Sequence, residues 1–345
     1  MSKFINTIKI KNFKSINNIS ISNCSRINLF VGRPNVGKSN LLEALSLFST
    51  PYFKNNTNKK VSNFLRLENE AELFFDGNVE KEILIETEIA TCQINYSKSL
   101  GIDINKNSIG WADLKKLLIS LNFNEFSHEL NFTIDEKLNV KSLSRYDNIS
   151  FPIKKYSFEP NTKNKKLNIP FLLPPFGINI LNIIEANKKL KNDLANIFSE
   201  YSLKLVFDKA SQSLKILKND QENDLFLIPY NSVADTLQRI IFFKTAISSN
   251  ENSVLLFEEP EAHSFPPYIV HITQEIIHST SNQFFITTHS PYIVNDFLEN
   301  SRRELSIFST DFQNGETVIR KLTNDEVEDV YQYGVDLFTN NETYL

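Results

Sequence analysis

The stretch from Gly32 to Ser39 constrains the fold of this chain more than any other feature. It reads G-x-x-x-x-G-K-S, follows an apolar run that ends at Val31, and precedes a segment with helical spacing. The two glycines let the backbone curl so that successive N–H groups point at phosphate oxygens, and the new helix adds the positive end of its dipole. The pattern therefore predicts a strand, a phosphate-binding loop and a helix, in a chain that binds a nucleoside triphosphate.

The residues of this loop have separate expected roles. Lys38 is expected to reach the β- and γ-phosphates, and the Ser39 hydroxyl is expected to hold Mg²⁺. The remaining nucleotide contacts are expected from the rest of the loop and the first helical turn, namely Gly32, Arg33, Pro34, Asn35, Val36, Gly37 and Asn40. ATP and Mg²⁺ are the expected cofactors.

GTP is the alternative nucleotide, because Gly-Arg-Pro-Asn-Val-Gly-Lys-Ser is also similar to the loop of translation-factor GTPases. Those proteins recognise guanine through an N-K-x-D segment whose aspartate pairs with the base. The Asn-Lys pairs of this chain begin at residues 58, 105, 164 and 187, and none of them is followed by that aspartate. The sequence therefore favours ATP.

Two continuous apolar runs late in the chain each end in polar residues. The first ends in Glu258 and Glu259, and the second ends in Thr-Thr-His-Ser-Pro, which contains His289. A helical pattern separates the two runs, which is typical of a parallel sheet covered on both faces. We expect Glu258 to join Ser39 in holding Mg²⁺, Glu259 to polarise the attacking water, and His289 to contact the γ-phosphate. The predicted catalytic residues are Glu259, Lys38 and His289, and the alternative is that the two acids and the histidine are structural.

Composition limits the class of protein. The chain has 345 residues, 41% apolar residues, two cysteines and a net charge of −4. It contains no apolar run of the roughly 20 residues that a membrane span requires, and two cysteines do not form a disulfide framework. We therefore expect a cytoplasmic protein without a membrane partner. The mild negative charge gives no global reason for nucleic-acid binding and leaves a local basic groove open.

Outside the motifs, the pattern predicts further strands and helices. Strands are expected over residues 4–10, near Ile19 and Ile21, over 64–76 and 82–90, and in a hairpin over 203–216; helices are expected over 111–130, 178–201 and 231–247, and a loop over 146–170. The alternation within 82–90 predicts a sheet with one face in water. We expect a nucleotide-binding head formed by residues 1–100 and 226–345, with residues 101–225 as an inserted lobe.

Four motifs, in this order, resemble those of the ABC-type head ATPases, and most closely the OLD-like and RecF/SMC-like branch often called AAA ATPases. They are Asn12-Phe13-Lys14-Ser15, the phosphate loop, Leu256-Phe257-Glu258-Glu259-Pro260-Glu261-Ala262-His263 and Thr288-His289-Ser290-Pro291. The resemblance implies an α/β fold, a P-loop NTPase of ABC head type. Its mixed sheet would be flanked by helices and accompanied by an antiparallel β subdomain and an inserted α-helical lobe. It also implies Lys14 as a nucleotide-binding residue.

The resemblance further implies a head-to-tail dimer with ATP in the interface, completed by a signature segment from the other protomer. Residues 231–239 are the candidate segment, in which Ser232 is expected to act across the dimer, and the alternative role of Ser232 is a plain helix N-cap. The implied partners are a second copy, or a higher homo-oligomer formed through ATP-bound heads, and a separate effector protein. DNA is left open as a partner. Ala234 departs from the usual signature glycine, and Glu258 replaces the usual aspartate.

The sequence thus predicts an ATP-hydrolysing head that switches by ATP-dependent dimerisation. By resemblance, its setting is the sensor or regulator part of bacterial anti-phage defence, or DNA maintenance. OLD nucleases carry a further C-terminal metal-dependent nuclease domain, and the chain ends too soon after His289 to hold one, so we expect no nuclease activity. The alternatives are a non-catalytic ATP-bound scaffold that holds an effector or toxin, and a RecF-like DNA repair ATPase.

Overall fold

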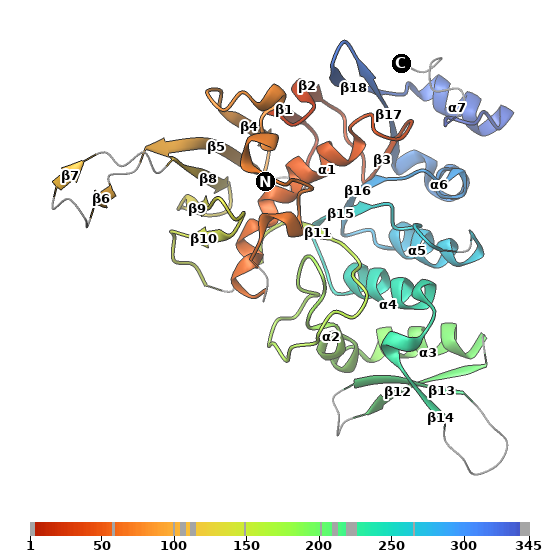
Figure 1. Ribbon diagram of the computed structural model, residues 1–345. Helices are drawn as coiled ribbons and strands as arrows, with labels where there is room; N and C mark the ends of the chain where they lie inside the picture. The colour runs from red at the N-terminus through yellow and green to blue at the C-terminus, as the bar shows by residue number, and fades with distance from the viewer. Residues whose placement is uncertain are drawn as a thin grey trace.

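The computed structural model describes two large sheets with helices packed between and around them (Figure 1). It describes residues 4–56, 59–98, 101–103, 108–110, 115–147, 150–200, 202–208, 213–218, 226–264 and 266–338. Within these residues, no helix combines the length and the apolar character that crossing a membrane requires.

The central sheet has six strands in the order β11-β15-β16-β3-β17-β18. Their bounds are β3 Ile27–Val31, β11 Ile153–Tyr156, β15 Val254–Glu258, β16 Gln283–Thr287, β17 Leu305–Gln313 and β18 Glu316–Lys321. All neighbours are parallel except β17 and β18. The two apolar runs that end in Glu258 and before His289 therefore lie side by side in a parallel sheet, as predicted.

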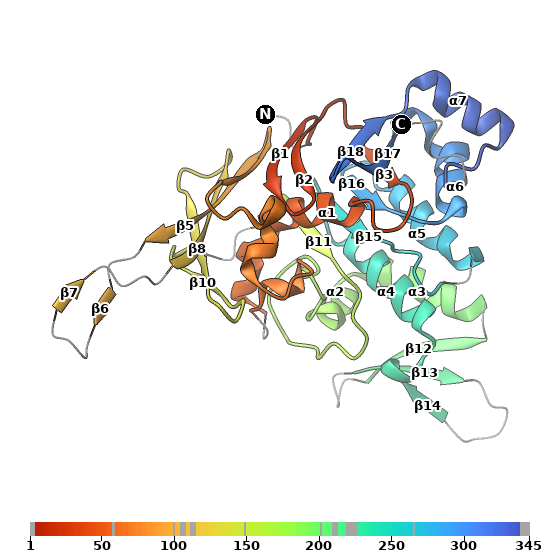
Figure 2. The ribbon, with the colours of Figure 1, turned by 45° about the horizontal axis from the view of Figure 1, so that its top comes forward.

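Helices cover both faces of the central sheet. One face packs on α1 (Lys38–Ser46), and the other packs on α4 (Asp235–Ser248), α5 (Pro266–His278) and α6 (Pro291–Ser301), as Figures 1 and 2 show. Neighbouring residues of one strand divide between these cores, because successive side chains of a strand point to opposite faces. Phe30 packs with α1, whereas Leu29 packs with the other three helices. This arrangement explains why the strands are apolar throughout.

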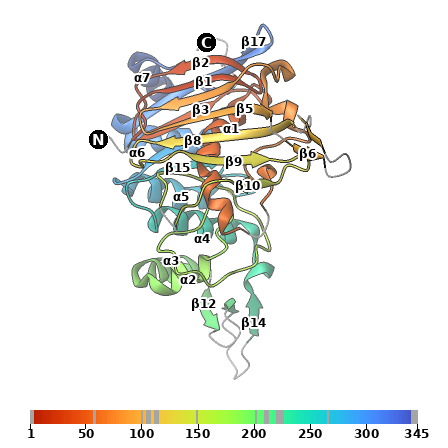
Figure 3. The ribbon, with the colours of Figure 1, turned by 90° about the vertical axis from the view of Figure 1, so that its left-hand side faces the viewer.

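The second sheet is antiparallel, with the strand order β10-β9-β8-β5-β4-β1-β2, and Figure 3 shows it with its strands stacked above one another. Its bounds are β1 Ile8–Phe13, β2 Ile16–Ile21, β4 Ile83–Thr87, β5 Ala90–Lys98, β8 Lys115–Phe123, β9 Leu130–Ile134 and β10 Val140–Ser142. One face packs on α1 within the same core as Phe30. Ile83 and Ile85 are buried while Leu84 and Glu86 are partly exposed, so the predicted alternation is confirmed.

Two of the predicted elements, and a third that is described below with β11, differ in type from the structure. The strand predicted over 64–76 is wrong, because this stretch contains the 3₁₀ turns η3 (Glu70–Leu73) and η4 (Phe75–Gly77) and follows the turn η2 (Val61–Asn63). The helix predicted over 111–130 is wrong, because residues 115–123 form β8; residues 111–114 lie outside the described part of the chain. The leucines alone follow helical spacing, but Leu117 and Leu121 also alternate with Ile119 and Phe123 in steps of two, and pairing with β5 selects the strand.

The helix predicted over 178–201 is divided into α2 (Ile180–Ala186) and α3 (Lys188–Glu200). Asn187 lies between them, and its side-chain oxygen accepts a hydrogen bond from the Leu190 backbone amide at 3.0 Å. Asn187 therefore starts a new helix where a continuous pattern was expected.

The predicted hairpin is confirmed as β12 (Leu203–Asp208) and β13 (Ser213–Lys218), and β14 (Phe226–Pro229) extends it to three strands. We expected residues 101–225 to form one lobe, but they are divided among three parts of the fold. Some of their strands belong to the antiparallel sheet, β11 belongs to the central sheet, and the stretch from α2 to β13 forms a part of its own. Two further short strands, β6 (Gly101–Asp103) and β7 (Ser108–Gly110), pair with each other. The domain division stays a prediction, and the strand pairings favour a shorter lobe between α2 and β14.

Strand β11 lies in the region predicted as a loop, and two buried lysines explain the difference. The Lys154 ammonium donates to Asn250 Oδ1 at 2.7 Å and to Ser253 Oγ at 3.0 Å, and it lies 4.3 Å from the centre of the Phe171 ring. Lys155 points from the opposite face of the strand toward Glu258. These partners satisfy the buried ammonium groups, so a polar sequence forms a core strand.

Replacing Lys154 by Met is expected to reduce the pH dependence of stability. Burial lowers the pKa of Lys154 from 10.5 to about 7, so between these values the unfolded chain binds a proton that the folded chain lacks. The free energy of unfolding therefore rises with pH across this window, with a slope of at most about 1.4 kcal/mol per pH unit from this group. Urea unfolding between pH 6.5 and 9 measures the slope. Lys188→Met, which changes an exposed lysine, is the control; equal slopes in both variants would contradict the prediction.

Candidate functional site

The phosphate loop joins β3 to α1, as the sequence predicted, and its glycines lie where no other residue fits. Gly37 precedes α1 with a φ of +100°, and a Cβ atom there would lie 2.0 Å from Thr317 Oγ1. A Cβ atom on Gly32 would lie 2.2 Å from the Thr310 carbonyl oxygen. Both glycines therefore provide a left-handed backbone and room for the β17–β18 hairpin against the loop.

A chain of hydrogen bonds fixes the loop from outside. Asn40 Nδ2 donates to Ser15 Oγ at 2.6 Å, the Ser15 and Thr317 hydroxyls lie 2.6 Å apart, and Thr317 Oγ1 donates to the Val36 carbonyl oxygen at 3.0 Å. Ser15 belongs to the Asn-Phe-Lys-Ser motif that the sequence singled out. The sequence did not indicate a role for Thr317, because its partners Ser15 and Val36 lie near the opposite end of the chain.

Replacing Thr317 by Val is expected to weaken nucleotide binding several-fold. The side chain keeps its shape but no longer donates to Val36, and an unpaired buried carbonyl costs about 1–3 kcal/mol. Thr317 is buried. Fluorescent-nucleotide titration measures the effect, and Thr317→Ser should restore affinity. Thr133→Val, on the partly exposed face of β9, is the matched control. An unchanged affinity for Thr317→Val would show that the loop holds its shape without this bond.

Lys38 lies folded over the loop. Its ammonium donates to the Gly32 carbonyl oxygen at 2.9 Å and to the Arg33 carbonyl oxygen at 2.6 Å, and only 4% of the residue is exposed. Burial lowers the pKa of Lys38 to about 8, although the charge of Glu259 acts in the opposite direction. Among the residues that the structure describes, no carboxylate forms an ion pair with Lys38, so the loop holds a positive charge that is balanced only by carbonyl oxygens.

Glu258 ends β15 within reach of the loop. Its carboxylate accepts a hydrogen bond from Ser39 and forms ion pairs with Lys155 at 3.2 Å and Arg66 at 2.9 Å. Burial acts to raise the pKa of Glu258, but Lys155, Ser39 and Arg66 outweigh it and hold the pKa below its usual value. A carboxylate beside the hydroxyl of a phosphate loop suits Mg²⁺, which takes one or two protein oxygens together with phosphate oxygens and water. Ser39 and Glu258 are therefore fit to hold the metal of a bound Mg-ATP.

Arg66 is a site residue that the sequence did not identify. Its guanidinium reaches Glu258 although 72% of the side chain is exposed. The segment is positioned by Lys14, which pairs with Glu43 of α1 and donates to the Arg66 carbonyl oxygen at 2.7 Å. The Arg66 amide in turn donates to Glu43 at 3.2 Å. Lys14 thus holds the segment that carries Arg66, and the direct nucleotide contact expected of Lys14 stays a prediction.

Glu259 and His289 face each other at the ends of β15 and β16. His289 Nε2 lies 3.5 Å from Glu259 Oε1, and more than a third of the Glu259 side chain is exposed. Burial and the charge of Lys38 lower the pKa of His289 below its usual value, although the charge of Glu259 opposes them, and this favours the neutral imidazole. Glu261 fixes the adjoining turn by accepting from the Thr288 hydroxyl at 2.6 Å and the His289 amide at 2.9 Å. The structure therefore brings Glu259, His289 and Lys38 into one electrostatic group.

Ser232 lies apart from this group. It ends the 3₁₀ turn η5 (Tyr230–Ser232), and α4 begins only at Asp235, with Ala234 at the N-cap position, so the N-cap alternative for Ser232 is wrong. The side chain is exposed. Strand β14, which leads into η5, lies at the far end of the molecule from β3 and α1 in all three views. A role for Ser232 at its own phosphate loop is not favoured, and its role across a dimer stays a prediction.

Within the described ranges, no group of three or more His, Cys, Asp or Glu side chains is arranged to hold a metal by itself. A metal at this site would therefore depend on Ser39, Glu258 and the phosphates of a nucleotide, which is the usual binding mode of Mg²⁺. Metal and nucleotide are expected to bind together.

Known proteins resemble this chain in sequence and in fold. A family model described as "AAA domain, putative AbiEii toxin, Type IV TA system" matches residues 27–295. An ATP/GTP phosphatase of Helicobacter pylori is 22% identical over 342 residues, which covers 87% of this chain and 89% of the relative.

Two solved SMC heads cover nearly the whole chain. One is an SMC head bound to the C-winged helix domain of ScpA, with a TM-score of 0.51 and 13% identity. The match covers 94% of this chain and 99% of the SMC head chain. An SMC head with an extended coiled coil from Pyrococcus furiosus, bound to the C-terminal domain of ScpA, covers 96% and 99% at a TM-score of 0.50 and 12% identity. The predicted fold class, an α/β P-loop NTPase of the SMC and ABC head type, is confirmed.

Proposed function

Because the chain belongs to the AAA-domain family that matches residues 27–295, we propose that it binds and hydrolyses ATP and switches by pairing with a second copy. One observation carries the proposal. The phosphate loop, Glu258, and the Glu259–His289 pair lie at the carboxyl ends of β3, β15 and β16, which are neighbours in one parallel sheet. Ligands of open α/β sheets bind at this edge.

Each residue has a defined part in the proposed reaction. Lys38 and the loop amides hold the phosphates, while Ser39 and Glu258 hold Mg²⁺, which neutralises charge on the phosphates when bound. Glu259 accepts the proton of the attacking water. The surroundings of His289 favour its neutral form, which can donate a hydrogen bond to the γ-phosphate without adding a charge. The missing N-K-x-D segment favours ATP over GTP.

The switch depends on a second protomer. The exposed Ser232 follows β14, which lies far from β3 and α1 in all three views, and this placement supports a contact with the phosphate loop of the partner. The similarity in fold to SMC heads supports the proposal that this chain is a head of the same type.

We place the chain in the OLD-like branch. We propose that it is the sensor or regulator of anti-phage defence or DNA maintenance and acts on a separate effector protein. The toxin named in the family description supports that setting.

Light scattering with and without Mg-ATP tests the switch. In the Glu259→Gln protein, which is expected to retain ATP, the mass should double when Mg-ATP is added. Adding Ser232→Arg in that background should keep the mass at that of one chain, because a long cation would obstruct the interface. Phosphate release by the wild type is measured beside it. A mass that ATP does not change, with no phosphate release, would favour the constitutive scaffold.

A further inference from the structure

A basic groove lies at the opposite end of the α1–η1 segment from the phosphate loop. Its walls come from the end of η1 (Leu47–Lys54), from residue 59, and from β10 with the residues that follow it, and it has a volume of about 580 Å³. Four of its lining residues are cationic, namely Lys54, Lys59, Lys141 and Arg145, and no acidic side chain lines it. In a chain with a net charge of −4, this is a local concentration of positive charge.

These charges are available to a ligand. Lys59, Lys141 and Arg145 are exposed, and none of the three side chains has an ion pair within the described part of the chain. They come from separate segments that the fold brings together, because the backbone of Val140 donates to the Lys59 carbonyl oxygen at 2.8 Å. A cluster of unpaired cations without acids attracts an anion with several charges.

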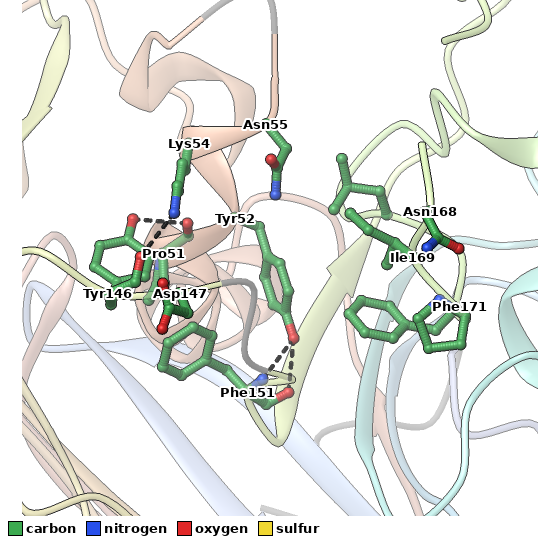
Figure 4. A pocket seen from close by; sticks show the side chains of 12 residues that line it. Pro51, Tyr52, Lys54, Asn55, Tyr146, Asp147, Phe151, Asn168, Ile169 and Phe171 are labelled. Carbon is green, nitrogen blue, oxygen red and sulfur yellow. Dashed lines mark hydrogen bonds between the residues drawn. The ribbon is translucent and has the colours of Figure 1, made fainter. Parts of the chain in front are cut away.

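Aromatic rings adjoin the cations. Phe53, Phe132 and Tyr146 line the groove, and Tyr146 and Lys54 are shared with a second hollow lined by Tyr52, Phe151 and Phe171 (Figure 4). Lys54 donates to the Tyr146 carbonyl oxygen at 2.7 Å, and the Tyr146 hydroxyl donates to the Pro51 carbonyl oxygen at 2.8 Å. Tyr146 is therefore a fixed ring at the junction of the two hollows.

The second hollow has polar groups at its rim. Asn55 and Asn168 line it beside the rings, and Asp147 is its one acidic lining residue (Figure 4). Side-chain amides can donate to and accept from the edge of a nucleobase. The two hollows share Lys54 and Tyr146 and together form a path with cations on one part and side-chain amides on the other. Tyr146 is the partly exposed ring along this path, whereas the phenylalanine rings and Tyr52 are buried behind it.

We propose that this path binds single-stranded nucleic acid, with phosphates on Lys59, Lys141 and Arg145 and a base stacked on Tyr146. A charged groove combined with aromatic rings is the general mode of single-strand binding, because every base has a face that can stack. A duplex hides those faces, and an acidic peptide would use the cations but not the rings. The proposal does not depend on ATP hydrolysis, because none of these residues belongs to the phosphate-loop site.

Fluorescence anisotropy of a labelled oligothymidine of about twelve nucleotides tests the proposal on the full chain. The wild type should bind it, and excess ATP should not displace it. The variant Lys141→Ala/Arg145→Ala should weaken binding about tenfold or more. It should also lower the slope of log affinity against log salt by about 1.4, since each phosphate contact on a single strand contributes about 0.7.

The control Lys188→Ala/Lys189→Ala removes the same charge from exposed positions on α3 and should bind as the wild type does. Tyr146→Leu should weaken binding without changing the salt slope, provided that its circular dichroism melt matches the wild type. Three results would overturn the proposal: no binding of the oligonucleotide, equal binding of a duplex of the same length, or equal competition by polyglutamate.

Discussion

Replacing Glu259 by Gln is expected to lower ATP turnover by about a hundredfold to ten-thousandfold, the usual contribution of a positioned general base. Gln keeps the size of the side chain and can still hydrogen-bond to His289 and to water. It cannot accept the proton of the attacking water. Glu259 has a φ of +43°, and because Glu and Gln have the same backbone preferences, the substitution should not disturb the backbone.

ATP binding is expected to survive this change. The Glu259 carboxylate lies near the charge of Lys38 and therefore near the phosphates of bound ATP. Replacing it by a neutral amide removes a repulsion between two negative charges, so ATP binding should not weaken. Phosphate release and fluorescent-nucleotide binding measure the two effects separately. A loss of turnover with unchanged or tighter binding identifies an interaction made in the transition state.

Glu251→Gln is the matched control, because Glu251 is an exposed acid on the loop before β15 and lies outside the site. It should hydrolyse ATP at the wild-type rate. If Glu259→Gln also kept that rate, the general base would have to be another group. His289→Ala would then be the next variant, since the imidazole is the nearest titratable partner of Glu259.

The parts of this site that the sequence predicted are those whose chemistry is local. The phosphate loop shows its function within eight consecutive residues, and Glu258, Glu259 and His289 are recognised because each ends an apolar strand. Parallel strands bring such ends to one edge, so their proximity followed from the fold class. The observed contact of His289 with Glu259 and the hydrogen bond of Ser39 to Glu258 agree with that expectation.

The residues that were missed depend on contacts between distant segments. Arg66 reaches Glu258 from a stretch that was predicted as a strand, and Lys155 reaches it from a stretch that was predicted as a loop. Thr317 supports the phosphate loop from a hairpin with no motif of its own. Periodicity shows which residues face a core, but it does not show which partner a polar side chain will meet.

Replacing Lys38 by Met is expected to remove most of the affinity for ATP. Removing one partner of a buried, hydrogen-bonded charge pair costs about 2–5 kcal/mol, which corresponds to a loss of about thirtyfold or more in affinity. Met keeps the apolar stem of Lys38 and removes a buried charge, so we expect the Lys38→Met protein to fold normally. The Gly32 and Arg33 carbonyl groups lose their donor, so a small destabilisation is expected.

Thermal unfolding with and without Mg-ATP separates these effects in one experiment. The wild type should melt at a higher temperature with Mg-ATP, because a ligand that binds only the folded state stabilises it by mass action. Lys38→Met should melt near the wild-type temperature without nucleotide, and Mg-ATP should raise its melting temperature much less than it raises that of the wild type. Lys188→Met, on exposed α3, should show the full rise. A full rise in Lys38→Met would mean that the loop amides and Ser39 hold the phosphates without the lysine, and the role of Lys38 would then be limited to the transition state.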